Sequence, residues 1–302
     1  MNPVAGGGRA AHALPALRQF AQEERWPVEI CVTQSANDLA EKARSATCQG
    51  YHRIFVLGGD GTFQILLNSV ADHRDVVLGL IPAGGGNDLA ASLGLPSDPV
   101  RAAKLLLHGE VSRIDAVRVR TGEGYDRFYS GGGGVGLDAE AARHASGAFR
   151  NVPGRARYLL SAIRALVGFR KLRARVSVQS ADAQEFDVTP LLVSVLNTPS
   201  YGGGVRLAPG ASTDDGLLDL VILENLSVLE ILSLLPRLFS RGTLKTNQLR
   251  RLHVKCVRIE TDPPCRFHGD GEILGTTPVE ISIVPQACCI IRPRPADLEG
   301  IP

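Results

Sequence analysis

The sequence lacks the features that mark membrane-spanning, secreted and nucleic-acid-binding proteins. No apolar run approaches the ~18 residues needed to cross a bilayer. Glycines, Arg9 and His12 interrupt the amino-terminal stretch, so a secretion signal is not expected. The formal net charge is only +2, which is too small to indicate nucleic acid as a partner. We therefore expect a cytoplasmic protein that does not bind nucleic acid.

Cysteine patterns typical of metal sites are also absent. None of the cysteines has C-x-x-C spacing or lies near paired histidines, so a zinc site is not expected. They are Cys31, Cys48, Cys256, Cys265, Cys288 and Cys289. None lies in a glycine-rich turn, so buried, unreactive thiols are the favoured interpretation. The remaining composition, 44% hydrophobic and 21% charged over 302 residues, is that of a soluble globular protein with two domains.

Two glycine-rich turns stand out in the first third of the chain. Ile54 to Leu57 is an apolar run of strand length, and Gly58-Gly59-Asp60-Gly61-Thr62 follows it. Val76 to Ile81 is a second such run, and Pro82-Ala83-Gly84-Gly85-Gly86-Asn87-Asp88 follows that one. Ligands of open α/β sheets bind at the carboxyl ends of strands, where bare amides at a helix start can face phosphate. The alternative is that these glycines only supply positive φ for tight connections.

Asp60 gives the first turn a further meaning. A carboxylate beside a phosphate is repelled unless a divalent cation lies between them, so Asp60 predicts Mg²⁺ together with a nucleotide. Because two such turns occur in adjacent β-α units, we expect both to face one crevice.

The rest of the first domain reads as alternating helices and strands, with one exception at its start. Asn2 to Gly8 resembles a loop that leaves a strand, yet no strand precedes it. Either a strand lies upstream of Met1 or the sheet has an unpaired position. The expected elements are helices over 12–24, 35–46, 87–93 and 99–107 and a strand over 28–33, with Ser35 and Asp38 as a cap pair.

Beyond Glu110 the pattern changes from β-α alternation to strands. We place the domain boundary there, giving an α/β domain over 1–110 and a mainly antiparallel β-sandwich over 111–286. The expected strands are 114–119, 125–129, 174–179, 191–196, 217–223, 254–260 and 279–284, and the expected helices are 137–146, 155–169 and 226–239. A last strand over 288–291 is expected to return to the first domain, which would then include 287–302.

Two acidic turns in the second half can carry chemistry. Ser212 to Asp219 offers carboxylates and carbonyls for Mg²⁺ or Ca²⁺, although an Asx turn explains the pattern without a metal and is favoured. Asp270-Gly271 is a hairpin signal, and Glu272 just beyond it is free to take a proton from an attacking hydroxyl.

Basic residues gather between 143 and 175 without any Asp or Glu between 141 and 181. They are Arg143, Arg150, Arg155, Arg157, Arg164, Arg170, Lys171, Arg173 and Arg175. A solvated face is one interpretation. An anionic membrane surface is the other, because an amphipathic helix lies within the run; nucleic acid is disfavoured because interleaved aromatics are absent.

Taken together, these segments resemble the diacylglycerol kinase catalytic-domain family, which includes bacterial lipid kinases and sphingosine kinases. The resemblance spans nearly the whole chain. It depends on six segments in the family's order: Asn2-Pro3 with its glycines, Gly58–Thr62, Pro82–Asp88, Gly134–Ala139, Asn197–Asp219 and Asp270–Glu272.

The resemblance implies an ATP-dependent lipid kinase with its active site in the interdomain cleft. Glu272 would be the general base and Asp60 would act on magnesium-bound phosphates. The expected ATP-binding residues are Asn2, Pro3, Thr33, Gly58, Gly59, Asp60, Gly61, Thr62, Gly84, Gly85, Asn87, Asp88, Asp270 and Gly271. A structural Mg²⁺ is expected through Asp215 and the carbonyls of Ser212 and Leu217, and Asp115 matches an acidic position that shapes the interdomain region.

Substrate and partners are less well defined by the sequence. Asp138, Glu140 and Arg143 are candidates for the lipid headgroup, although such neighbours on a helix are more often surface residues. Peripheral membrane association is expected through the basic region. The sequence does not define the oligomeric state, and a homodimer is one of the possibilities.

This chain also departs from the family pattern. Gly85 replaces a usual Thr, Gln64 and Ile65 replace a usual Asn-Glu, and Gly131 stands where Asn is frequent. Two alternatives therefore stay in view. One is an NAD kinase, although two segments typical of that family are absent. The other is a nucleotide-sensing or membrane-binding protein without turnover.

Overall fold

A computed structural model describes residues 1–73, 75–150, 152, 154, 156–179, 183–224, 226, 230 and 248–298. The chain divides into two compact units: unit 1 is Met1–Ile114 with Gln286–Pro302, and unit 2 is Asp115–Pro285. The sequence predicts this boundary at residue 110 and the return of the chain to the first unit at residue 287. Most of the helix expected over 226–239, and Arg155 of the basic region, lie outside the described residues. No helix among the described residues is long and apolar enough to cross a membrane.

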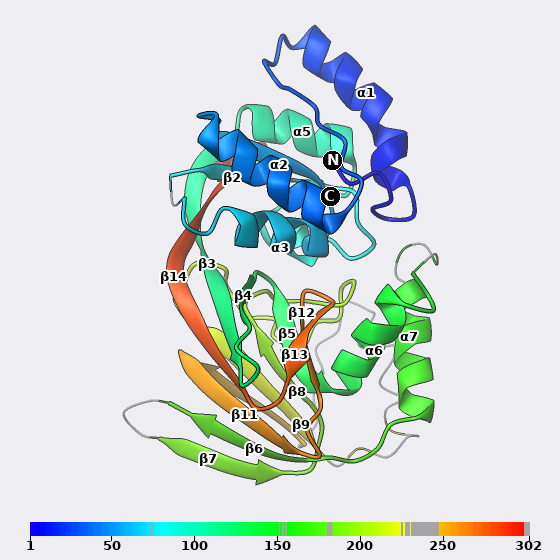
Figure 1. Cartoon of the computed structure of the whole chain (residues 1–302), viewed down its shortest axis with the longest axis vertical. Coiled ribbons are helices and arrows are strands. Elements are labelled where there is room, and N and C mark those ends of the chain that lie inside the picture. Colours follow the sequence, from blue (N-terminus) through cyan, green and yellow to red (C-terminus); the bar gives the residue numbers. More distant parts are fainter. Residues whose placement is uncertain are drawn as a thin grey trace. The chain divides into compact units, whose positions relative to one another are not determined.

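Unit 1 is built on parallel strands covered by helices (Figure 1). β1 (Arg53–Gly58) pairs with β2 (Val77–Pro82), and β2 pairs with the end of β14 (Val279–Arg292). The helices are α1 (Arg9–Glu23), α2 (Ala36–Cys48), α3 (Asp60–Ser69), α4 (Asp88–Ser92), α5 (Pro99–Leu107) and α9 (Pro295–Leu298). α1 packs on α5 and α2 on α3, while α3 and α5 contact the strands.

Local sequence explains where two of these helices begin. The Ser35 hydroxyl accepts a hydrogen bond from the Asp38 amide at 3.1 Å, as the expected cap requires, and Asp98 caps α5 through the Arg101 amide at 2.7 Å. Pro99 then occupies the first helical turn, where its missing N–H costs nothing.

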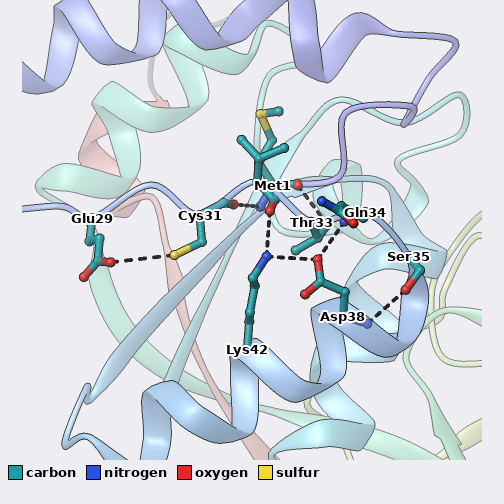
Figure 2. A network of polar contacts seen from close by, with 9 residues as sticks. Met1, Glu29, Cys31, Thr33, Gln34, Ser35, Asp38 and Lys42 are labelled. Atoms are coloured by element: carbon teal, nitrogen blue, oxygen red, sulfur yellow. Dashed lines mark hydrogen bonds and ion pairs between the residues drawn. The ribbon is translucent and has the colours of Figure 1, made fainter.

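The strand expected over 28–33 is wrong, because that segment belongs to no strand. It lies extended, and among the described residues its ladder-like bonds join it to Met1 alone. The Met1 N–H₃⁺ donates to the Cys31 carbonyl at 2.7 Å, and the Met1 carbonyl accepts from the Thr33 amide at 2.9 Å (Figure 2). A parallel strand needs a neighbour along its length. Apolar residues alone therefore did not make this segment a strand.

Unit 2 is a β-sandwich, as expected. One sheet has β14 followed by β11 (Cys256–Asp262), β6 (Arg173–Val178) and β7 (Gln184–Val188). β3 (Glu110–Thr121) pairs with β14 and with β4 (Asp126–Tyr129). The other sheet has six strands in the order β10 (Leu249–Val254), β9 (Leu218–Glu224), β8 (Pro190–Leu196), β5 (Gly132–Gly136), β12 (Arg266–Gly269) and β13 (Glu272–Thr276).

Strand β8 shows why this half needs helices as well. Every residue of β8 is buried, which requires cover on both faces. Val193 and Val195 face the core between the sheets, whereas Leu192 and Leu196 join a second core with residues of α6 (Leu137–Ser146) and α7 (Ala156–Val167). The two helices lie together against this unit (Figure 1).

Several strands of unit 2 departed from expectation. The glycine run Gly132–Gly136 forms β5, a fully buried strand, although it has almost no side chains from which to recognise one. The segments 279–284 and 288–291, expected as two strands, form the single strand β14, with Gln286 at φ 51° where the two parts meet. β14 therefore belongs to both units.

Candidate active-site residues in the two units

The two glycine turns of unit 1 touch each other through their backbones. A Cβ built on Gly84 would lie 2.5 Å from Gly59 Cα, and one on Gly59 would lie 2.9 Å from Gly84 Cα. Carbon atoms do not approach so closely, so neither position accepts a side chain without movement of the turn. The Ala83 amide donates to the Gly58 carbonyl at 2.7 Å, which continues the β1–β2 ladder into the turns. The expectation that both turns face one place is met within unit 1.

The Asp60 carboxylate joins the first turn to the second. Its Oδ2 accepts from the Asp88 amide at 3.2 Å and its Oδ1 from the Leu89 amide at 3.1 Å, at the start of α4. Burial raises the pKa of Asp60, and the backbone amides oppose that rise. A carboxylate has about four lone-pair sites, so two amide bonds leave capacity for a cation.

The second turn is held by the side chain of Asn87. This residue has φ 58°, in the left-handed region that Asn tolerates better than most residues. Its Oδ1 accepts from the Gly84 amide at 2.8 Å and its Nδ2 donates to the Gly84 carbonyl at 3.0 Å. The Asn87 side chain therefore holds the second turn by hydrogen bonds to both backbone groups of Gly84. Arg9, which sequence reasoning missed, donates to the same Gly84 carbonyl at 3.0 Å and to the Ser97 carbonyl at 3.2 Å.

The amino-terminal loop reaches the first turn. Asn2 Nδ2 donates to Thr62 Oγ1 at 3.4 Å, and the Asn2 amide donates to the Leu57 carbonyl at 3.2 Å. The Thr33 hydroxyl donates to the Met1 carbonyl at 2.9 Å. The structure thus brings Asn2, Thr33 and Thr62 together with the glycine turns, all within unit 1. Their roles toward ATP stay predictions.

In unit 2, the Asp270 carboxylate anchors the loop that precedes β5. Oδ2 accepts from the Ser130 amide at 2.8 Å and hydroxyl at 3.0 Å, and Oδ1 accepts from the amides of Gly131 at 2.8 Å and Gly132 at 3.2 Å. Asp270 and Gly271 have φ 50° and 85°, as a two-residue hairpin turn of this kind requires. The Asp270 side chain therefore holds the backbone of residues 130–132 in place, and its role toward ATP stays a prediction.

Glu272 follows this turn as the first residue of β13, opposite Gly269. Its side chain is exposed to solvent, yet desolvation by surrounding protein raises the pKa of its carboxyl. Because water reaches the side chain, we expect a modest rise. Such a carboxylate is available as a proton acceptor near neutral pH.

Asp138, on α6, lies in a buried polar cluster of unit 2. Its Oδ2 accepts from the Ser194 hydroxyl at 2.6 Å and the Tyr201 hydroxyl at 3.3 Å, and it lies 3.6 Å from His268 Nε2. His268 is 2% exposed and stacks on Tyr201 with ring centroids 6.0 Å apart. Sequence reasoning missed Ser194, Tyr201 and His268, because nothing in their spacing relates them to Asp138.

Glu140, the other candidate for the lipid headgroup, is already in ion pairs. Its Oε2 accepts from Arg143 Nε at 2.9 Å and its Oε1 from Arg266 Nη1 at 3.1 Å. Burial works to raise the pKa of Glu140, but the two guanidinium groups outweigh it and the pKa falls. Glu140 and Arg143 thus form a paired patch on α6, and a headgroup role for it stays a prediction.

Comparison with known proteins assigns the family. Residues 1–119 match the model of the diacylglycerol kinase catalytic domain, and residues 133–292 match that of the YegS C-terminal NAD kinase beta sandwich-like domain. A diacylglycerol kinase of Mycobacterium tuberculosis is 31% identical over 97% of this chain and 94% of its own length. This chain belongs to the diacylglycerol kinase catalytic-domain family. The resemblance is confirmed, and the enzyme class is that of the lipid kinases.

Other relatives of this diacylglycerol kinase family member agree. A probable lipid kinase YegS-like of Chromohalobacter salexigens is 27% identical over 95% of this chain and 91% of its own length. A solved structure described as a putative diacylglycerol kinase from Bacillus anthracis aligns with TM-score 0.76 and 24% identity over 98% of this chain and 96% of that one. This last likeness supports the two-domain fold alone.

The acidic loop expected to hold a structural metal in this family member contains an Asx turn, and a metal role for Asp215 stays a prediction. Asp215 Oδ1 accepts from the Leu217 amide at 3.0 Å, and Ser212 Oγ donates to Asp214 Oδ1 at 2.6 Å. Asp115, which is 1% exposed, fixes the loop by accepting from the Gly216 amide at 2.7 Å. No cluster of three or more His, Cys, Asp or Glu with metal-ligand geometry occurs among the described residues.

Proposed function

We propose that the protein transfers the γ-phosphate of ATP to a hydroxyl group of a lipid, diacylglycerol or a related one. Family membership supports the kinase class, and the contact between the two glycine turns is the observation that carries the nucleotide assignment. Glycine at 59 and 84 lets the two turns meet, and Asp60 ties the start of α3 to the start of α4. Amides in the first turn of a helix have no partner within the helix and favour anions.

Glu272 is proposed as the general base of this reaction. The carboxylate takes the proton from the lipid hydroxyl as its oxygen attacks the γ-phosphorus, and ADP leaves with the bridging oxygen. General base catalysis of this kind contributes roughly 10²- to 10⁴-fold. Positioning and neutralisation of phosphate charge supply the rest.

Magnesium is the proposed metal at two places. With ATP, it would take oxygen ligands from the phosphates and from the remaining lone pairs of Asp60, and would neutralise phosphate charge. A structural ion would be held by Asp215 and the carbonyls of Ser212 and Leu217. This set is made of oxygen donors with one carboxylate, which fits a hard cation.

The assay is transfer of labelled phosphate from ATP to lipids in mixed micelles, with diacylglycerol and sphingosine as acceptors and NAD as a separate arm. We expect a labelled phospholipid with Mg²⁺ and loss of product with EDTA. Glu272→Gln should lower kcat by at least about 100-fold while leaving ATP affinity nearly unchanged. Glu41→Gln, an exposed position on α2, is the matched control.

Three other outcomes would contradict this proposal. Labelled NADP without labelled lipid would assign an NAD kinase. Binding of ATP and vesicles with no transfer to any acceptor would assign a protein without turnover. Full activity in Glu272→Gln would remove Glu272 from the base role.

We further propose that α7 brings the enzyme to an anionic membrane surface. Leu159, Ile163 and Val167 lie at i, i+4 and i+8 on this helix and are 37%, 39% and 80% exposed. The residues that α7 buries are Ser161, Ala165 and Leu166, so this apolar face is left to solvent. Exposed Arg164 and, just beyond the helix, Arg170 and Lys171 add positive charge. Each basic residue near such a surface contributes about 1 kcal/mol.

Vesicle sedimentation tests this membrane proposal. The triple variant Leu159→Ser, Ile163→Ser, Val167→Ser should bind vesicles of 30% phosphatidylserine at least about tenfold more weakly than the parent chain. The control is Val111→Ser, which removes an apolar side chain that is 49% exposed on β3. Equal binding of the triple variant and the parent would exclude α7 as the docking element.

A further inference from the structure

The glycines of β5 let one carboxylate of α6 reach across that strand. A Cβ built on Gly134 would lie 2.4 Å from Asp138 Oδ2, so glycine at this position leaves the room that the Asp138 side chain occupies. Oδ2 accepts from the Ser194 hydroxyl on β8, and Oδ1 accepts from the Ala139 amide at 2.8 Å. Asp138 is 8% exposed. Its carboxylate is thus fixed from two sides inside unit 2.

His268 on β12 is a further neighbour of this carboxylate. Its Nε2 lies 3.6 Å from Asp138 Oδ2, and the residue is almost fully buried. Among the described residues neither ring nitrogen has a hydrogen-bond partner. Burial of an imidazole without hydrogen bonds costs free energy, and an apolar side chain of similar size would avoid that cost. The attraction between the ring and the Asp138 carboxylate, which is stronger where water is excluded, offsets it.

The strand that carries His268 has few other side-chain anchors. β12 has four residues, and its partners in β5 are Gly133, Gly134 and Val135. The two glycines offer no cross-strand side-chain contact, which is the usual source of stability between antiparallel strands. Phe267 packs in the core between the sheets, opposite Val135, so the next residue, His268, faces α6. His268 therefore anchors the α6 face of β12.

The place of Glu272 depends on β12. In the part of the sheet that the structure describes, β13 is the end strand and β12 is its one partner. Glu272 opens β13 opposite Gly269, the residue that follows His268. A turn of two residues, Asp270 and Gly271, separates Gly269 from Glu272. A shift of the His268 ring along or across the sheet therefore moves the Glu272 carboxylate with it.

Helix α6 packs against both strands of this hairpin and holds it at two further points (Figure 1). Glu140 Oε1 accepts from Arg266 Nη1 at 3.1 Å, and the Ser146 hydroxyl donates to the Gly271 carbonyl at 3.0 Å. Both contacts are exposed to solvent, where such pairs contribute little. The buried ring of His268 is therefore the contact with α6 that can fix the position of the hairpin.

We propose that His268 is a positioning residue for the general base Glu272. Its ring, attracted to the fixed Asp138 carboxylate, holds the β12–β13 hairpin on α6 and keeps the Glu272 carboxylate in one orientation. In this role His268 touches neither ATP nor lipid and acts through the hairpin. The inference rests on the proposed kinase reaction, in which Glu272 takes the proton of the lipid hydroxyl. It predicts an effect on kcat with little effect on either KM.

The first test compares replacements of His268. His268→Leu removes unsatisfied buried polar atoms at similar volume, so Tm should not fall, whereas kcat should fall at least about tenfold with both KM values within about twofold. His268→Gln should keep kcat within about threefold, because its amide N–H can reach the same carboxylate. His268→Phe, which keeps a ring stacked on Tyr201, repeats the measurement should the leucine variant not fold. Equal losses for the apolar and glutamine variants, or a loss confined to the lipid KM, overturn the proposal.

His253→Leu is the matched control. His253 Nε2 also lies 3.6 Å from an aspartate oxygen, Oδ1 of Asp219, and it belongs to the same sheet, but on β10 at the other end. Its replacement should leave kcat unchanged. A loss in His253→Leu equal to that in His268→Leu would show a general effect of histidine removal and overturn the proposal.

A double-mutant cycle tests the partner of His268. In the background of Asp138→Asn, His268→Leu should lower kcat by less than about threefold, because the charge that attracts the ring is already gone. If the two losses multiply in full, His268 and Asp138 act separately, and their pairing is overturned.

Hydrogen exchange separates this inference from the kinase proposal, because it needs no substrate. Amides of residues 266–276 should exchange at least about tenfold faster in His268→Leu than in the parent chain, and at the parent rate in His268→Gln and His253→Leu. If this holds while the parent chain phosphorylates no lipid, the kinase proposal fails and the anchoring by His268 stands. Exchange of the hairpin at the parent rate in His268→Leu overturns the inference, whatever the activity.

Discussion

Substitution of Gly84 by alanine tests whether the contact between the two glycine turns supports nucleotide binding. The new Cβ would meet Gly59 Cα at 2.5 Å and Asn87 Oδ1 at 2.7 Å. The Asn87 side chain can rotate away, but Gly59 Cα is backbone. The first turn must therefore move by several tenths of an ångström or more, and with it the start of α3.

The cost can be bounded from overpacking in other proteins, which is typically about 1–3 kcal/mol. For a chain of this size that corresponds to a fall in Tm of roughly 2–10 °C. Because the displaced amides are those proposed to face phosphate, ATP affinity should fall by about tenfold or more, beyond what the lost stability explains at a temperature where the variant is folded. Thermal unfolding and ATP titration measure the two effects separately.

A matched control makes the result decisive. Gly168→Ala introduces a Cβ with no atom within 4 Å and at ordinary φ, so it should change neither quantity. If Gly84→Ala behaves like Gly168→Ala, the turns do not act together.

Two further outcomes follow from the carboxylates of unit 2. Desolvation raises the pKa of Glu272, so the proposed base is protonated and inactive over a wider acid range. The apparent pKa of the acid limb of the kcat–pH profile should therefore lie above the ordinary glutamate value of about 4.3. An apparent pKa at or below that value would contradict the assignment. Asp270→Asn keeps a residue that tolerates φ 50° but replaces an acceptor of the Ser130, Gly131 and Gly132 amides, which should cost about 1–3 kcal/mol and lower Tm, whereas Asp72→Asn at an exposed turn should not. Unchanged unfolding of Asp270→Asn would show that the loop is held by other contacts.

The parts of the fold that the sequence predicted are those with local physical signals. α6 was expected with its observed bounds, because the glycine run ends at Gly136 and a helical segment follows it from Leu137. The glycine turns were found because they follow apolar strands. Elements that lack a local signal were not predicted correctly. β5 was missed because it has no side-chain pattern, and the strand predicted over 28–33 was wrong because a strand also needs a neighbouring strand to pair with.

The candidate site divides in the same way. Short motifs contain Asp60, Asn87 and Asp270, so the sequence predicted them as site residues. In the structure their side-chain oxygens accept hydrogen bonds from backbone amides, which a motif does not reveal. The cluster of Asp138 with Ser194, Tyr201 and His268 is assembled by sheet pairing between β5, β8 and β12. Its members are far apart in the chain, and single-sequence reasoning has no means to connect them.

The long strand β14 sets the order in which this protein can mature on the ribosome. Most of unit 1 is encoded before unit 2, yet its sheet takes Cys289 and Ile290 as partners of Val77 and Leu78. These residues are synthesised after all of unit 2. Unit 1 must therefore wait for its last strand while unit 2 completes its own pairing, and a chain truncated before 286 would leave the exposed side of β2 open to aggregation.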